Sequence, residues 1–398
     1  MTRISTAQAF DSSIEQLQRR QSDLIETQTQ LSSGKRVNRA SDDPTAAARA
    51  ERALASMSRV DATQRGVEAS RALMSQTEGA LGDAGELMQR ARESLVAAGN
   101  GTYSDAQRLG IANELRGIRE QLLAVANRSD GAQGYLFGGQ GSAQAPFLDA
   151  PGGAQFRGTS GQALTAGAEP LPLSMDGGAT WLQARTGNGT FETRVVASTG
   201  SAWINTGTVV DPSAITGSTY NVQFAMNAGV MSYSVLRDGV AVQSDVAYTS
   251  GQAIEVDGMA VTITGAPAVG DDFEIIPSTS TLSVFDVLDK AVAELSTGGR
   301  PASQVTQSNA ENLRNIDQVM SRLQTARSDA GETLNRIDGV TDRLAGLKLQ
   351  SQTERSSAED LDMVQAISEF QNKQSGYDAA LKSYAMVQRL SLFQYLNG

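Results

Sequence analysis

The two ends of this chain lie far apart in the sequence, yet both carry apolar or aromatic residues at every seventh position, and no proline interrupts either end. A seven-residue spacing places such residues on one stripe of a helix, and the stripe is buried only when another helix packs against it. The stripes consist of Phe10, Leu17, Leu24 and Leu31 near the start and of Met363, Phe370, Tyr377 and Tyr384 near the end. The fold is therefore constrained first by what these terminal helices pair with.

Further apolar residues extend these stripes, and we call the complete sets the terminal rows. The additional members are Ile14 in the first row and Ile367, Leu381, Leu392 and Leu396 in the last. Glutamine occupies the row positions 21, 28 and 374. A polar residue in such a row selects one register and one partner at some cost in stability. The apolar ending of the chain can pack on its own molecule or stay open for another subunit or a carrier, because both arrangements bury the same side chains.

Helices are also predicted at residues 44–98, 104–127, 282–295 and 304–356. Their apolar residues fall on similar rows, which we call the inner rows. The members are Val60, Val67, Met74, Leu81, Met88 and Leu95 in the first row, Ile111, Leu115, Ile118, Leu122 and Val125 in the second, and Ile316, Leu323, Ala330, Ile337 and Leu344 in the third. We expect the inner rows to pair within the molecule as a stem.

The centre of the chain is rich in glycine and has the pattern of strands and turns. The predicted strands are residues 219–226, 230–236, 240–248 and 259–263, and turns are predicted at residues 227–229 and 238–239. Alternating apolar residues between such turns are typical of an antiparallel sheet. Residues 142–188 show little strand pattern and receive no assignment.

The sequence thus predicts an α+β protein, with a long α-helical coiled-coil stem formed by both termini and an inserted antiparallel β domain. The expected divisions are an N-terminal coiled-coil assembly segment (1–43), the N-terminal half of the helical stem (44–140), the inserted β domain (141–281), the C-terminal half of the stem (282–357) and a C-terminal coiled-coil assembly segment (358–398).

Composition excludes several classes of function. The chain has 44 acidic and 33 basic residues, a net charge of −11, so neither nucleic acid nor a membrane surface is expected as a partner. It has no cysteine and no histidine, which excludes thiolate nucleophiles, zinc-finger ligand sets and Ser-His-Asp triads. The N-terminus lacks the pattern of a cleaved Sec signal, so secretion would require a route without one.

Two acidic pairs are candidates for a metal or acid–base site. Asp42 and Asp43 directly precede Pro44, where a helix start needs a capping carboxylate and tolerates proline, so we expect a cap. The Gly-Asp-Asp sequence at residues 270–272 lacks the alternating oxygen ligands of a calcium loop, so we expect a turn. We therefore predict no catalytic residues, no cofactor, no metal site and no enzymatic activity.

Several segments resemble the flagellin family. The N-terminal signature of that family is similar to Leu31-Ser32-Ser33-Gly34-Lys35-Arg36-Val37-Asn38-Arg39-Ala40-Ser41-Asp42-Asp43-Pro44. The sequence Tyr-Leu-Phe-Gly-Gly at residues 135–139 and the ending at residues 390–396 resemble the branch that forms the hook-filament junction. Residues 263–273 resemble a segment common in hook-associated proteins. The resemblance covers about residues 1–140 and 282–398, and Pro44 departs from the small residue usual in filament flagellins.

The resemblance implies a secreted structural subunit of the bacterial flagellum that is exported unfolded through the flagellar type III channel and joins hook to filament. Its implied partners are further copies of itself in a ring or helical array, a hook-side hook-associated protein, flagellin, and an export chaperone on the C-terminal helix. The terminal rows would then be buried between subunits, and the β domain would face outward. A filament flagellin is the alternative within the family, and a secreted coiled-coil effector or adhesin with a β head is the alternative from another class.

Overall fold

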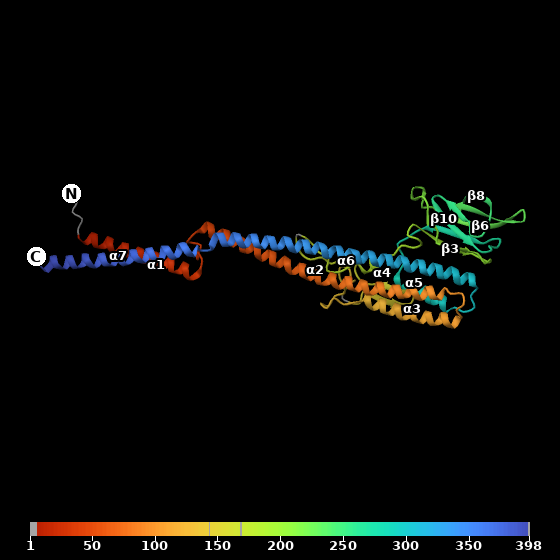
Figure 1. The fold of residues 1–398 in the computed structure, drawn as a ribbon, viewed down its shortest axis with the longest axis horizontal. Coiled ribbons are helices and arrows are strands. Elements are labelled where there is room, and N and C mark those ends of the chain that lie inside the picture. Colours follow the sequence, from red (N-terminus) through yellow and green to blue (C-terminus); the bar gives the residue numbers. More distant parts are fainter. Residues whose placement is uncertain (1–5, 143, 168, 397–398) are drawn as a thin grey trace. The chain divides into compact units, whose positions relative to one another are not determined.

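The computed structural model describes residues 6–142, 144–167 and 169–396, and the side chains of residues 11–386 within these ranges. The helices are α1 (Thr6–Ser33), α2 (Pro44–Ala98), α3 (Asp105–Ala126), α4 (Gly177–Trp181), α5 (Val284–Ser296), α6 (Ala302–Glu359) and α7 (Met363–Leu396) (Figure 1). Strands occupy the region between α3 and α5. The predicted α+β class, with terminal helical regions and an inserted antiparallel β domain, is confirmed.

The chain divides into two compact units. One consists of Met1–Arg65 with Val340–Gly398, and the other is Gly66–Gly339. The long helices α2 and α6 each contribute one part to the first unit and one part to the second. The five divisions expected from the sequence stay a prediction.

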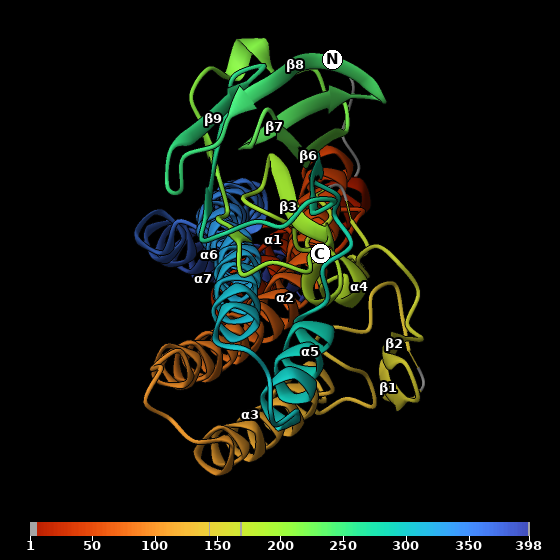
Figure 2. The same ribbon diagram turned by 90° about the vertical axis from the view of Figure 1, so that its right-hand side faces the viewer.

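Most members of the inner rows lie in the helical core. Every member except Ile111 is at most 9% exposed, and Ile111 is partly buried against the same core. In the second unit, α3 and α5 lie side by side (Figure 2), and ion pairs tie α2 to α6, including Arg327 with Glu78 and Arg92 with Asp317. The apolar period thus buries these helices within one chain, as the spacing predicted.

The region without a sequence assignment also packs on the helical core. It contains the hairpin of β1 (Phe147–Ala150) and β2 (Gly153–Phe156), followed by α4. Trp181 at the end of α4 is buried, stacks on Phe285 of α5 with 6.0 Å between ring centroids, and meets the edge of Phe137 at 5.3 Å. Aromatic rings contributed by three separate segments therefore close one side of the core.

The β domain has a core of its own between two sheets. The five-stranded sheet has the order β3-β11-β6-β7-β8, and in the smaller sheet β10 pairs with β4, β5 and β9. The strands are β3 (Phe191–Ala197), β4 (Trp203–Ile204), β5 (Thr208–Val209), β6 (Tyr220–Asn227), β7 (Val230–Arg237), β8 (Val240–Ala247), β9 (Ala253–Val256), β10 (Met259–Thr264) and β11 (Asp272–Pro277), with a short 3-10 helix at Pro212–Ala214. Both sheets contribute side chains to one buried cluster.

Two predicted turns join the strands of the larger sheet. Ala228 and Gly229 between β6 and β7, and Asp238 and Gly239 between β7 and β8, all have positive φ. Two consecutive residues of positive φ suit the twist of a two-residue hairpin loop, which explains why these sequences connect neighbouring antiparallel strands.

Asp271 lies between β10 and β11 and is 1% exposed. Its carboxylate accepts hydrogen bonds from the backbone N–H groups of Thr199 at 2.7 Å and of Ala268 at 2.8 Å, and also from Gly200 and the Thr199 hydroxyl. The predicted Gly-Asp-Asp turn is therefore also a buried link between two loops of the β domain.

We expect Asp271→Asn to destabilise the β domain by about 2 to 4 kcal/mol, because the new amide N–H groups would face buried donors that now share a carboxylate. The measurement is the free energy of unfolding of the strands, obtained from amide hydrogen exchange. Asp272→Asn is the matched control, since Asp272 is half-buried and, within the described part of the chain, its carboxylate accepts from the side chains of Asn221 and Gln223 alone. Equal losses in the two variants would contradict this role for Asp271.

Candidate assembly surface

The terminal helices α1 and α7 run antiparallel and in contact (Figure 1). Lys373 Nζ donates a hydrogen bond to Thr27 Oγ1 at 2.9 Å, and Thr27 and Ala366 are buried. A Cβ atom added to Gly376 would lie 2.7 Å from Arg20 Nη1. Small and polar residues thus fill the contact between the two helices, where a heptad stripe usually places large apolar ones.

The terminal rows are not buried within the chain. Met363, Ile367 and Leu381 are 45%, 46% and 42% exposed. The remaining members with described side chains are only half-buried; they are Ile14, Leu17, Leu24, Leu31, Phe370, Tyr377 and Tyr384. The side chains of Phe10, Leu392 and Leu396 lie outside the described residues. The same heptad spacing therefore has opposite outcomes in the inner and the terminal rows.

Other exposed apolar residues enlarge this surface beyond the predicted rows. Ile25 on α1 is 54% exposed, and Val364 and Met386 on α7 are 82% and 61% exposed. They fall outside the seven-residue rows, so the spacing does not reveal them. Apolar residues that gather on an exposed surface mark a place where another protein packs.

A short clasp joins the end of α1 to the break between α6 and α7. Gly34 has φ of +71°, which suits glycine at the end of a helix, and its N–H donates to the Gln30 carbonyl at 2.8 Å. Its carbonyl accepts from the N–H of Leu361 at 3.0 Å, and the N–H of Arg36 donates to the carbonyl of Glu359 at 2.7 Å. The Leu-Ser-Ser-Gly turn therefore pairs with a segment more than 300 residues further along the chain.

Glu359 is the charged centre of this clasp. Its carboxylate lies 3.2 Å from Lys35 Nζ and 2.8 Å from Arg355 Nε, and its side chain is 14% exposed. Arg36 donates to the carbonyl of Ala358 at 2.9 Å and pairs with Asp43 at 3.2 Å. Sequence reasoning missed Glu359, because a lone glutamate near a helix end carries no pattern that reveals distant partners.

The remaining signature residues shape the start of α2. Pro44 is its first residue, and Asp43 Oδ1 accepts from the N–H groups of Thr45 at 3.1 Å and Ala46 at 3.0 Å, which is the predicted cap. Asp42 Oδ2 accepts from the N–H groups of Asn38 and Arg39. Ser32 is exposed, and the Ser33 hydroxyl donates to the Gln30 carbonyl at 3.2 Å.

These bonds lower the pKa of both aspartates. The N–H of Arg39 is the main cause for Asp42, and the N–H of Ala46 is the main cause for Asp43, because each donor favours the ionised carboxylate. The two carboxylates therefore serve the backbone. Within the described ranges, no group of three or more acidic side chains could hold a metal ion, and no helix there is long and apolar enough to cross a bilayer.

Comparisons with known families match three regions of the chain. Residues 4–142 match the bacterial flagellin N-terminal helical region, and residues 313–396 match the bacterial flagellin C-terminal helical region. Residues 195–277 match the D2-like domain of flagellar hook-associated protein 1. The two helical regions include both terminal helices and the clasp, and the third match falls on the β domain.

Individual relatives cover nearly the whole chain. The chain is 26% identical to flagellar hook-associated protein 3 of Salmonella typhimurium over 412 aligned residues, which cover 98% of this chain and 99% of the relative. Its fold is similar to the crystal structure of flagellar hook-associated protein-3 from Legionella pneumophila, with a TM-score of 0.71, 25% identity, and coverage of 76% of this chain and 97% of that one. FlgL from Xanthomonas campestris gives a TM-score of 0.68 at 29% identity, with coverage of 77% and 99%.

We expect the start of α2 to weaken as the pH falls. The folded chain binds protons at Asp42 and Asp43 less readily than the unfolded chain does, so their contribution to stability is complete above the ordinary carboxyl pKa and is lost as the pH falls through the lowered pKa of each. Amide hydrogen exchange of Thr45 and Ala46 between pH 7 and pH 2 measures this. Asp43→Asn keeps an uncharged capping oxygen, so its remaining pH dependence should come from Asp42, and an unchanged pH profile in that variant would contradict the role of Asp43.

Proposed function

This chain belongs to the flagellin family, and from that premise we propose that it is the structural subunit that joins the hook to the filament of the bacterial flagellum. Its place in the cell is the flagellum, outside the cell body. The nearly complete coverage by hook-associated protein 3 supports the junction role, as does the match of the β domain to a domain of a second hook-associated protein. Both findings favour a hook-associated subunit over a filament flagellin.

One observation carries the assembly mechanism, which is the contrast between buried inner rows and exposed terminal rows. Two antiparallel helices can shield only one side of each other's stripe, so Met363, Ile367 and Leu381 keep contact with water. Helices from neighbouring subunits would bury these side chains as a coiled coil. Because the contact joins different surfaces of adjacent subunits, it produces a ring or a helical array of this chain.

The same surface accounts for the other proposed partners. A hook-side hook-associated protein and flagellin would continue the terminal helical layer on either side of the junction. Before export, an apolar helix such as α7 would be covered by a chaperone that accepts it in a groove. A chain without cysteine can then pass unfolded through a narrow channel without cross-linking. In this proposal the terminal rows mediate assembly with each partner, and no catalytic group takes part.

Charged residues placed in the C-terminal row should abolish assembly. In the pair Ile367→Glu and Leu381→Glu, two carboxylates would have to enter the apolar contact between subunits, where they lack partners. The expected result is loss of attached filaments by electron microscopy and release of flagellin into the medium. The circular dichroism of the purified variant should match that of the parent.

The control adds the same charges on the opposite face of α7. Asn372 and Ser383 are exposed and lie about half a turn away from the row. Asn372→Glu with Ser383→Glu should leave filaments attached. Normal filaments in the Ile367 and Leu381 variant would show that the terminal row is not buried between subunits.

A deletion strain separates the junction role from the alternative of a filament flagellin. Without a junction subunit, the cell should retain its hooks and lose flagellin to the medium, because filament has nothing to attach to. Without its only flagellin, the cell would release none. Immunogold labelling should mark one band at the distal end of the hook, whereas labelling along the filament would support the alternative, and a secreted adhesin would label neither.

A further inference from the structure

The β domain and the helical core are separate apolar clusters within one compact unit. Their buried residues do not overlap. Two chain segments connect them, and these pair with each other, since Ala184 and Leu282 exchange backbone hydrogen bonds at 3.0 Å and the N–H of Thr186 donates to Thr279 at 2.9 Å. A narrow two-stranded neck leaves rotation about its own axis poorly constrained.

Side chains of α6 make the contacts that restrict this rotation. Arg314 Nη1 donates to Thr193 Oγ1 at 2.9 Å, and Nη2 donates to the carbonyl of the same residue at 3.5 Å. Gln307 Oε1 accepts from the N–H of Ile204 at 3.0 Å. The two contacts reach β3 and β4, which lie in different sheets of the β domain. We call Arg314 and Gln307 the latch.

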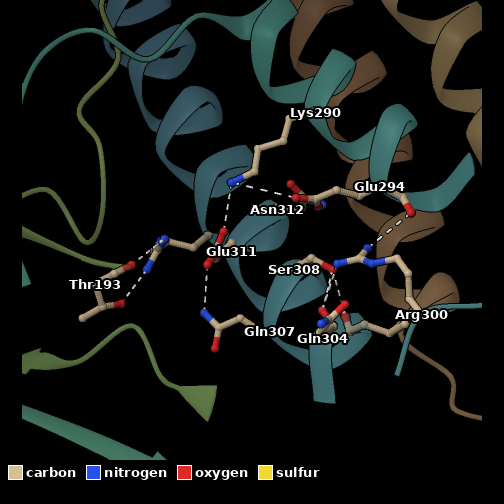
Figure 3. Close-up of polar contacts among 11 residues, drawn as sticks. Thr193, Lys290, Glu294, Arg300, Gln304, Gln307, Ser308, Glu311 and Asn312 are labelled. Atoms are coloured by element: carbon tan, nitrogen blue, oxygen red, sulfur yellow. Dashed lines mark hydrogen bonds and ion pairs between the residues drawn. The ribbon is translucent and has the colours of Figure 1, made fainter. Parts of the chain in front are cut away.

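A network of charged residues holds Gln307 from the helical side. Gln307 Nε2 donates to Glu311 at 2.8 Å, and Lys290 of α5 donates to the other oxygen of Glu311 at 2.9 Å (Figure 3). A cavity of about 390 Å³ lies beside these residues and is lined mainly by polar and charged side chains. The described bonds between the two bodies at this cavity are therefore polar and have defined directions.

Burying the charge of Arg314 costs free energy, so a residue that only stabilised the fold would not need to be charged. The side chain of Arg314 is 7% exposed, its Nε has no hydrogen-bond partner among the described residues, and its described hydrogen bonds go to Thr193, which is uncharged. Burial lowers the pKa of this guanidinium, which reflects the cost of removing it from water. Replacing a buried charge by an apolar residue of similar size is often neutral or stabilising. A buried guanidinium does, however, fix geometry, because its fork of donors is rigid.

We propose that Arg314, supported by Gln307, is a positioning residue that sets the direction in which the β domain projects from the helical stem, and that it adds little to the stability of either body. A change at Arg314 should then alter the spread of β-domain orientations without lowering the thermal midpoint of unfolding. The proposal does not depend on the junction role, because it concerns one chain in solution.

Spin labels can test this directly, because the full-length chain has no cysteine of its own. Ser244 on β8 and Ser321 on α6 are exposed, so Ser244→Cys with Ser321→Cys provides one label on each body. Double electron–electron resonance should give a narrow distribution of distances between the two labels when Arg314 is present. Adding Arg314→Met should broaden or shift the distribution while the thermal midpoint stays the same or rises. Arg314→Lys keeps the charge but lacks the fork, so it should also broaden the distribution.

The matched control is Arg327→Met. Arg327 lies on the same helix as Arg314, but it pairs with Glu78 of α2 within the helical core. Its distribution should remain narrow. An unchanged distribution in Arg314→Met would overturn the positioning role. A thermal midpoint that falls sharply in both Arg314 variants would show that the residue serves stability, which would also overturn the proposal.

Discussion

The burial of heptad stripes is the constraint on which the rest of this structure depends. Around the inner rows, several helices and a cover of aromatic rings remove the apolar side chains from water. The terminal pair has only two helices, and two helices cannot enclose a stripe on all sides. Completing the burial of Met363, Ile367 and Leu381 would contribute roughly 1 kcal/mol per side chain, given about 1.5 to 3 kcal/mol for full burial. In the proposed assembly, neighbouring subunits would gain this free energy by burying the exposed row residues of the terminal helices.

Much of the fold was predictable because its signals are local. The start of α2 at Pro44 follows from an adjacent carboxylate and the fixed φ of proline, and the β6–β7–β8 meander follows from its two hairpin turns. The packing of residues 142–188 was not predictable, because it depends on rings such as Trp181 and Phe285 that lie about 100 residues apart and follow no period. The roles of Glu359 and Arg314 were not predictable for the same reason, since each residue bonds to a segment far away in the sequence.

The signature that identifies the family has a structural meaning beyond its use as a motif. Its glycine ends α1, its basic residues reach Glu359 and Asp43, and its aspartates start α2. These polar contacts occur where the apolar rows are interrupted between helices. Hydrogen bonds and ion pairs have defined directions, whereas apolar burial does not, so the clasp can fix how consecutive helices continue from one another.

The clasp and the latch therefore have a different role from the apolar rows. Apolar rows supply the free energy for pairing but tolerate many rotations and registers, and a subunit that must match its neighbours on both sides needs those degrees of freedom removed. Glu359 joins the end of α1 to the break between α6 and α7, and in our proposal Arg314 orients the β domain on α6. Both side chains are largely buried, and their bonds have defined directions. In the proposed assembly, burial of the exposed apolar residues of α1 and α7 supplies the free energy, and the polar contacts of the clasp and the latch determine the geometry in which the subunits meet.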